Sequence, residues 1–276
     1  MAVSMADITK LRKMTGAGMM DCKNALTEAE GDFDKAMKII REKGKAVAAK
    51  RSDREAAEGC VLAKVADGFG AIIALKCETD FVAKNEDFVK LTNDILDAAI
   101  AHKCKTLDEV KALPLGDTTV AQAVIDRSGI TGEKMELDGY MTIEAPVIAV
   151  YNHQNKNFLC TMVALNKAVE GVDRIGHEVA MQVAAMNPIA ISEADVPAEV
   201  LAKEKEIAAD KARQEGKPEN MIEKIAMGRI GKFYKEVCLL KQEYIQDAKM
   251  TVADFLKAAD KDLTVTAFKR FTLRAE

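Results

Sequence analysis

The sequence predicts an α+β protein in which antiparallel hairpins carry helices. Two stretches show the same order of elements, strand, strand and helix. In the first stretch, segments 60–66 and 71–77 alternate as strands do, and they flank the turn sequence Asp67-Gly68-Phe69-Gly70. In the second, strands are expected at 141–151 and 158–165, with the polar turn 152–157 between them. These stretches share an organisation and no clear sequence repeat.

A helix is expected after each hairpin. Phe88, Leu91, Ile95 and Ala99 recur at helical spacing and predict a helix ending near His102. After the second hairpin, the apolar residues at helical spacing are Val172, Ile175, Val179 and Val183, and this helix ends before Pro188. Shorter helices are expected at 107–113 and 120–125.

Residues 1–54 predict a bundle of three short helices. Gly16 and Gly18 end the first helix, and Gly31 ends the second. Asp32 is the expected N-cap of the third helix, which is predicted to stop at Gly44. A core this small contributes a few kcal/mol of stability.

Met19 and Met20 are adjacent on the second of these helices. Neighbouring helical residues point about 100° apart, so both side chains cannot enter one small core. At least one is therefore expected on the surface, where the flexible methionine side chain suits an adaptable binding contact.

The C-terminal third predicts a different architecture. Segments 199–214 and 219–234 favour helix and are separated by Glu215-Gly216-Lys217-Pro218, which predicts an antiparallel helical hairpin. Its apolar stripe is thin for a coiled coil; it consists of Val200, Ile207, Ile222, Ile225 and Phe233. A strand at 237–240, a helix capped by Thr251 and a strand at 265–273 are expected to follow.

The chain accordingly divides into five predicted segments. Residues 1–54 form the helical bundle with its linker, and 55–140 form an N-terminal core subdomain. Residues 141–197 form a C-terminal core subdomain, into which the hairpin 198–235 is inserted. The return segment 236–276 completes that subdomain.

Composition limits the classes of function. The 276 residues carry a net charge of −4, which does not favour nucleic-acid binding. A local basic run could be an RNA patch or a solvated helix face; its members are Lys43, Lys45, Lys50, Arg51 and Arg54. No signal peptide and no membrane-spanning segment is expected. The six scattered cysteines favour a reduced, cytoplasmic setting.

No motif of the sequence predicts an active site. The histidines His102, His153 and His177 lie far apart and show no metal spacing. Gly228-Arg-Ile-Gly231-Lys232-Phe233 resembles a phosphate loop, but its spacing is short and Phe233 replaces the Ser or Thr that would bind Mg²⁺. We therefore expect no enzyme, no metal and no cofactor, and a protein that works through contact with another protein.

Asp80 and Phe81 lie side by side in the short connection between the first hairpin and its helix. From the residues alone, the simpler interpretation is that Phe81 packs beneath the helix start as a hydrophobic staple. The alternative is that the connection presents both side chains for binding, since working residues often lie on loops held by a rigid scaffold.

Two segments resemble the bacterial elongation factor Ts family. They are 11–26 (LRKMTGAGMMDCKNAL) and 77–84 (CETDFVAK), and weaker similarity covers nearly the whole chain. The resemblance implies a guanine-nucleotide exchange factor for elongation factor Tu, which binds the GDP-bound and nucleotide-free partner and promotes GDP release. It also implies that the bundle is similar to a ubiquitin-associated domain.

The resemblance also implies roles for individual residues. Thr79, Asp80, Phe81 and Val82 match the family's segment that disturbs Mg²⁺ coordination in the partner. Further partner contacts are implied for four residues, namely Arg12, Met19, Met20 and His153. Without a relative, His153 would be interpreted as an ordinary turn residue.

The sequence departs from the family in two places. It stops at Glu276, so the C-terminal helical module of fuller bacterial members is expected to be missing. Gln182 replaces a histidine that some members carry. Some relatives dimerise through the helical hairpin, and the thin apolar stripe leaves that expectation open here.

Two other functions compete with exchange. A non-exchanging adaptor would bind its partners through the bundle and the hairpin without accelerating nucleotide release. An RNA-binding module would use the basic run, and its affinity would fall steeply with salt.

Overall fold

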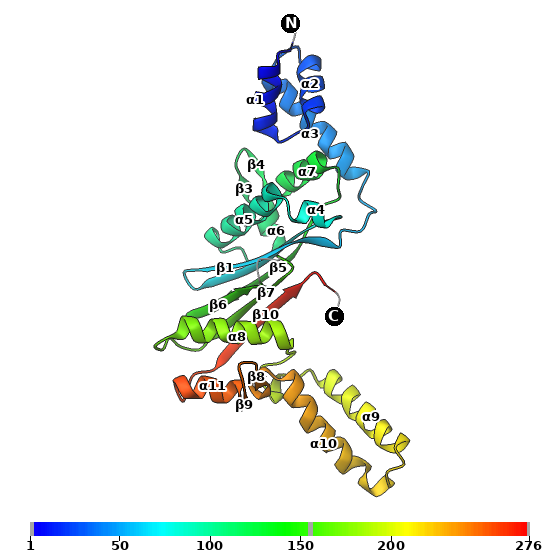
Figure 1. Cartoon of the computed structure of the whole chain (residues 1–276), viewed down its shortest axis with the longest axis vertical. Coiled ribbons are helices and arrows are strands. Elements are labelled where there is room, and N and C mark those ends of the chain that lie inside the picture. The colour runs from blue at the N-terminus through cyan, green and yellow to red at the C-terminus, as the bar shows by residue number, and fades with distance from the viewer. Residues whose placement is uncertain (1–2, 154–156, 275–276) are drawn as a thin grey trace. The chain divides into compact units, whose positions relative to one another are not determined.

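The computed structural model of the chain describes residues 3–153 and 157–274. Its contacts divide it into two units, which are treated separately below. Unit 1 comprises residues 1–62, 72–140 and 272–276, and unit 2 comprises 63–71 and 141–271. The mixture of helices and small sheets agrees with the predicted α+β class (Figure 1). The five predicted segment boundaries remain predictions.

The three expected N-terminal helices are present in unit 1. They are α1 (Met5–Thr15), α2 (Met19–Glu28) and α3 (Phe33–Ala49). Gly16 caps α1 in the left-handed conformation, and Asp32 accepts a hydrogen bond from the Lys35 amide at the start of α3. The core is small and largely aliphatic; it contains Ile8, Leu11, Ala17, Cys22, Ala25, Leu26, Ala29 and Ala36.

The prediction that the third helix stops at Gly44 is wrong. α3 continues for five more residues, to Ala49, and Gly44 lies buried against Gly129 of α7 (Val120–Thr131). A glycine inside a helical pattern can mark either a C-cap or a close helix crossing. Here Gly44 is explained by the close crossing of α3 and α7.

The first hairpin consists of β1 (Glu58–Ala66) and β2 (Phe69–Cys77), and the first sheet has the order β1-β2-β5. Asp67 and Gly68 both have positive φ, as a two-residue type I′ turn requires. The turn is thus two residues shorter than predicted, because Phe69 and Gly70 already belong to β2.

The remaining elements of unit 1 surround this hairpin. α4 (Asp80–Ala83) and α5 (Glu86–Ala101) follow β2, and His102 caps α5 as predicted. α6 (Leu107–Ala112) and α7 follow, with the short strands β3 (Pro114–Leu115) and β4 (Thr118–Thr119) between them. These two strands were not predicted, and α7 is six residues longer than predicted.

The strand predicted at 141–151 is two strands. β5 (Glu136–Glu144) belongs to the first sheet, and β6 (Val147–Asn152) belongs to a second sheet of order β10-β7-β6. Pro146 lies between them and has no amide hydrogen to donate to a sheet. The continuous apolar pattern concealed this change of sheet. Residues 154–156 of the predicted turn lie outside the described residues.

In unit 2, β7 (Leu159–Leu165) pairs antiparallel with β6, and β10 (Val265–Thr272) lies on its other side. α8 (Val172–Met186) and α11 (Val252–Ala259), capped by Thr251 as predicted, belong to this unit (Figure 1). A single core joins these elements; it includes Val163, Leu165, Ile175, Val179, Val183, Val252, Leu256 and Val265.

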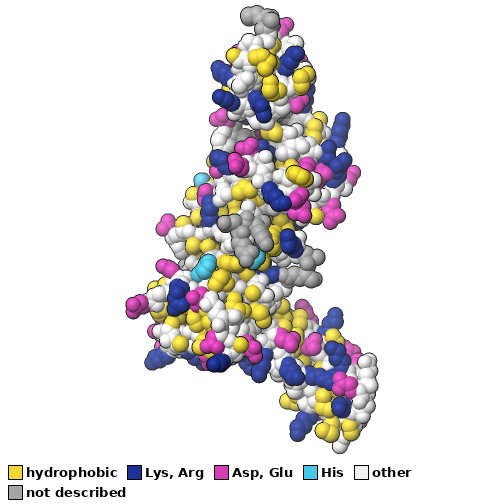
Figure 2. All heavy atoms as spheres, viewed as in Figure 1, with side chains coloured by type: hydrophobic (Ala, Val, Ile, Leu, Met, Phe, Trp, Pro, Cys, Tyr) yellow, Lys and Arg dark blue, Asp and Glu magenta, His cyan; other side chains and the backbone are white. Residues whose placement is uncertain are grey.

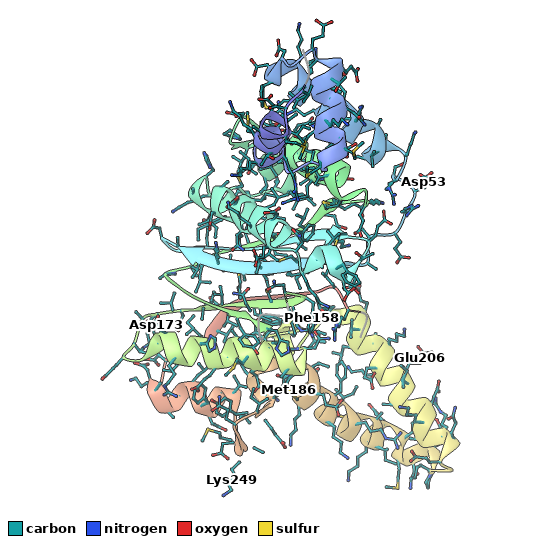
Figure 3. The ribbon with its side chains drawn as sticks, turned by 45° about the horizontal axis from the view of Figure 1, so that its top comes forward. Asp53, Phe158, Asp173, Met186, Glu206 and Lys249 are labelled. Carbon is teal, nitrogen blue, oxygen red and sulfur yellow. The ribbon has the colours of Figure 1, made fainter. Side chains whose placement is uncertain are left out.

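The predicted helical hairpin is present as α9 (Ala198–Gln214) and α10 (Glu219–Val237), which lie side by side (Figure 1). Its buried residues are mostly alanine; they are Ala208, Ala212, Ile222, Ala226 and Ile230. Small side chains allow the two helices to pair without the broad apolar stripe of a coiled coil. Charged side chains such as Glu206 lie on the exposed face (Figure 3).

The prediction of a strand at 237–240 is wrong. α10 continues through Val237, and Leu239–Lys241 form the 3₁₀ turn η3. A single parallel bridge joins Ala190 to Cys238. A short buried apolar run does not distinguish a strand from the end of a helix. The strands β8 (Glu243–Tyr244) and β9 (Asp247–Thr251), which follow, were not predicted.

Gln182 forms a buried amide network at the end of α8. Its Nε2 donates to Gln242 Oε1 (3.2 Å) and to the Glu243 carbonyl (3.1 Å). Its Oε1 accepts from the Ile245 amide (2.9 Å). Gln242 Nε2 in turn donates to the Glu236 carbonyl (2.7 Å), near the end of α10. Gln182 thus connects α8 with the chain that follows the hairpin.

The Gln182→Ala variant is expected to lose about 1–3 kcal/mol of unfolding free energy, because it leaves buried donors and acceptors without partners. Urea unfolding followed by circular dichroism would measure the loss. Gln214→Ala, at an exposed position at the end of α9, is the matched control and should change stability little. Equal stability of the two variants would contradict the assigned role of the network.

Candidate functional site

The sequence assigned a role in unit 1 to the segment Thr79, Asp80, Phe81 and Val82, called the 79–82 tip below. It follows β2 directly and contains the first three residues of α4. Thr79 caps α4, its Oγ1 accepting from the Val82 amide (3.4 Å). Ala83, the last residue of α4, is buried, so the tip has a packed base.

The Phe81 side chain is 85% exposed. The staple interpretation is therefore wrong, because a staple residue would be covered by the start of the helix. A large aromatic ring in water can gain about 1.5–3 kcal/mol when a partner buries it. Phe81 is thus available to contact another molecule.

Asp80 lies beside Phe81 and faces Lys84. Lys84 Nζ donates to Asp80 Oδ2 at 2.6 Å, one turn along the chain. This hydrogen bond and the positive charge lower the pKa of the Asp80 carboxyl. Both side chains are more than half exposed, so the pair stabilises the fold little. Asp80 therefore presents an ionised carboxylate at neutral pH.

Two carboxylates hold the base of the tip in a reciprocal arrangement. Glu133 accepts from the backbone amides of Glu78 (3.2 Å) and Thr79 (3.1 Å), and from Thr79 Oγ1 (2.6 Å). Glu78 accepts from the Lys134 amide at 2.6 Å. Each carboxylate thus binds backbone beside the other, and we call these two residues the Glu78–Glu133 pair.

Two arginines that follow α3 complete the base. Arg54 Nη1 lies 2.9 Å from Glu78 Oε2, and Arg51 Nη1 lies 3.3 Å from Glu78 Oε1. The Lys134 backbone hydrogen bond, followed by those from Arg54 and Arg51, lowers the pKa of Glu78. Sequence reasoning missed this pair, because 54 residues separate Thr79 from Glu133. Charge-assisted hydrogen bonds of this kind are among the stronger ones.

The basic run is partly neutralised by these contacts. Arg51 and Arg54 pair with Glu78, and Lys43 lies 3.9 Å from Glu28. Lys45 is exposed within α3, and the exposed Lys50 follows the end of that helix. Such pairing reduces the positive field that an RNA phosphate backbone would meet.

The bundle exposes both methionines in question. Met19 is 40% exposed and Met20 is 63% exposed. At least one of them was expected on the surface, and both lie there. Met5 and Met14 are exposed as well, and Arg12 lies exposed on α1. Apolar side chains lie among basic ones on the visible face of the bundle (Figure 2).

In unit 2, His153 directly follows β6. Its Nδ1 lies 2.9 Å from the Tyr151 hydroxyl, and its ring makes an edge contact with Phe158 at 5.6 Å between centroids. Phe158 lies close to α8 in Figure 3. These contacts orient the half-buried imidazole more firmly than a simple turn residue would require.

The cysteines contribute no reactive thiol. All six are buried, and none forms a disulfide. Burial raises the pKa of the Cys60 and Cys77 thiols to about 12, so both remain protonated at neutral pH. Within residues 3–153 and 157–274, no cluster of His, Cys, Asp and Glu could hold a metal. No helix in the same ranges is long and apolar enough to cross a membrane.

Exposed apolar side chains on firmly held supports define a class of protein that works by binding another macromolecule. Comparison with known proteins identifies the family. The family model for elongation factor Ts matches residues 78–275. The chain therefore belongs to the elongation factor Ts family, whose members are elongation factors of protein biosynthesis.

Curated relatives extend this similarity to the full chain. Elongation factor Ts of Bacteroides fragilis is 60% identical over 332 aligned positions, and that of Bacteroides thetaiotaomicron is 58% identical. The Porphyromonas gingivalis protein is 53% identical over 277 positions. Each comparison covers 100% of this chain and 100% of the relative.

The Glu78 carboxylate predicts a pH dependence of stability. Its pKa is lowered on folding, so its contribution is complete above the ordinary value of 4.5 and is lost as pH falls through the lower folded value. We expect Glu78→Gln to be less stable than the parent at pH 7, and the difference to shrink below about pH 4. Denaturant unfolding at several pH values would measure it, and a difference independent of pH would contradict the assignment.

Proposed function

We propose that this protein is a nucleotide exchange factor that binds elongation factor Tu carrying GDP and promotes release of the GDP. GTP then binds the nucleotide-free partner and displaces the factor. Membership of the elongation factor Ts family supports the choice of partner. The observation that carries the proposal is Phe81, exposed on a base that several charge-assisted hydrogen bonds hold.

The mechanism proposed for the 79–82 tip is mechanical and electrostatic. A GTPase holds GDP through loop amides around the phosphates and through a Mg²⁺ bound by a Ser or Thr hydroxyl. Mg²⁺ requires nearly ideal octahedral geometry, so small displacements of its ligands weaken binding. Phe81, with Val82 beside it, would insert against the partner helices that position those ligands. Thr79 would keep the tip in its capped conformation.

Asp80 would act at the same place. Its ionised carboxylate can accept a hydrogen bond from the partner or repel an acidic group near the Mg²⁺. Lys84 is its ion-pair partner in the free protein, and that exposed contact can be exchanged at low cost. This mechanism needs no covalent step. In the proposed function the protein is not an enzyme, and it uses neither a reacting residue nor a cofactor.

The energetics follow from coupling between two binding sites. If the factor weakens GDP binding, GDP weakens binding of the factor by the same amount. A coupling of about 5.5 kcal/mol corresponds to a roughly 10⁴-fold change in affinity. The factor therefore binds the nucleotide-free partner tightly, and GTP releases it through the same coupling.

Other contacts would supply docking energy. We assign Arg12, Met19 and Met20 to a bundle contact with the partner's nucleotide-binding domain, and His153 to a contact with a second domain. Homodimerisation through the helical hairpin stays a secondary proposal, supported by the exposed Met221 and Met227 on α10. Translation elongation would place this activity in the bacterial cytoplasm, with no membrane or direct nucleic-acid partner.

Release of a fluorescent GDP analogue from elongation factor Tu tests the proposal. The parent should accelerate release strongly. Phe81→Ala should reduce the acceleration by about 10–100-fold, because it removes about 1.5–3 kcal/mol of contact. Ile189→Ala, which removes another exposed apolar side chain, is the matched control and should behave like the parent.

Two outcomes would contradict the proposal in different ways. Full acceleration by Phe81→Ala would exclude the role of the tip. A parent that binds elongation factor Tu without accelerating release would instead be a tether.

A further inference from the structure

The bundle contacts the rest of unit 1 through a very close helix crossing. Gly44 of α3 faces Gly129 of α7. A Cβ at Gly129 would lie 2.2 Å from the Gly44 Cα and 3.0 Å from its carbonyl carbon, which real side chains do not permit. A Cβ at Gly44 would lie 3.5 Å from the Gly129 Cα, an ordinary contact. Only Gly129 is therefore required for this distance between the helices.

α3 and α7 also contact each other at further positions along the crossing. Arg41 of α3 lies 3.8 Å from Asp126 of α7, and both side chains are partly exposed. A cavity of about 270 Å³ opens beside the crossing, lined by residues that include Met14, Met37 and Ile130. The cavity leaves a gap in the side-chain packing on one side of the crossing. The close approach of Gly44 and Gly129 therefore sets the distance between the two helices.

The same helix leads directly to the 79–82 tip. Gly132 caps α7 in the left-handed conformation, and Ser128 Oγ donates to the Glu133 carbonyl at 2.5 Å. These contacts fix Glu133, whose carboxylate binds the Thr79 amide and hydroxyl. Arg127 of α7 also lies 3.3 Å from Asp87 of α5. One helix thus contacts the bundle at Gly129, in its last turn, and supports the tip through Glu133, just beyond its end.

We infer that Gly129 is a positioning residue for exchange: it lets α7 hold the exposed methionines of the bundle and Phe81 at a fixed separation, so that both contact one partner molecule together. This inference rests on the proposed function. Two contacts that bind together act through a high effective concentration, which is lost when their geometry forbids joint binding. Displacing the bundle should therefore weaken docking while leaving the tip intact.

A double-mutant cycle tests this role. GDP release would be titrated for the parent, Gly129→Ala and Gly44→Ala, each with and without Met20→Ala. We expect Gly129→Ala to raise the half-saturating concentration about tenfold with the saturating rate retained. Gly44→Ala should change it less than twofold. Both substitutions add one methyl group inside a helix and gain similar helix propensity, so their difference isolates the crossing.

The effect of Met20→Ala in the two backgrounds distinguishes a positioning role of Gly129 from a general loss of folded structure. Met20→Ala should raise the half-saturating concentration several-fold in the parent and less than twofold in Gly129→Ala, where the bundle contact is already lost. Equal factors in both backgrounds, or equal behaviour of Gly129→Ala and Gly44→Ala, would overturn the inference.

Two further controls keep the test decisive. If Gly129→Ala does not fold by circular dichroism, Arg41→Glu replaces it, because it removes the ion pair with Asp126 and places two carboxylates side by side, which weakens the contact between α3 and α7. If the parent binds elongation factor Tu without accelerating release, the proposed function fails. The same cycle measured as calorimetric affinity then still decides the positioning role.

Discussion

The arrangement of unit 1 depends on the reciprocal hydrogen bonds of the Glu78–Glu133 pair. Glu133 accepts from the Glu78 and Thr79 amides, Glu78 accepts from the Lys134 amide, and Arg51 and Arg54 neutralise Glu78. Partly buried charges cost free energy unless they are paired and hydrogen-bonded, and both conditions are met here. The pair joins β2, α7 and the chain after α3, so a short strand-to-helix connection acquires a firm base.

This base allows an apolar ring to stay in water without collapsing onto its own chain. Capping by Thr79 and burial of Ala83 orient α4, and they leave Phe81 exposed. A ring fixed in advance loses little conformational freedom on binding, so more of its contact energy is available to change the partner. In the proposed mechanism, rigidity at Glu133 is what makes displacement of Mg²⁺ ligands possible.

Local patterns predicted most helices and both hairpins, since helical spacing and turn residues are properties of neighbouring residues. These local patterns gave wrong predictions where contacts between residues distant in the sequence determine the structure of a segment. Gly44 looked like a helix end and is a crossing glycine, and the apolar run at 141–151 concealed the break at Pro146. Segment 237–240 looked like a strand and ends a helix. Exposure of Met19 or Met20 followed from spacing, whereas the Glu78–Glu133 pair lay beyond any local pattern.

In the proposed mechanism, the base of the tip, and not Phe81 alone, produces nucleotide release. The most direct measurement is the saturating rate of GDP release from elongation factor Tu promoted by Glu133→Ala. This variant keeps Phe81 and removes three hydrogen bonds to Glu78 and Thr79. The account predicts a rate reduced at least tenfold, towards that of Phe81→Ala. A rate equal to that of the parent would contradict it.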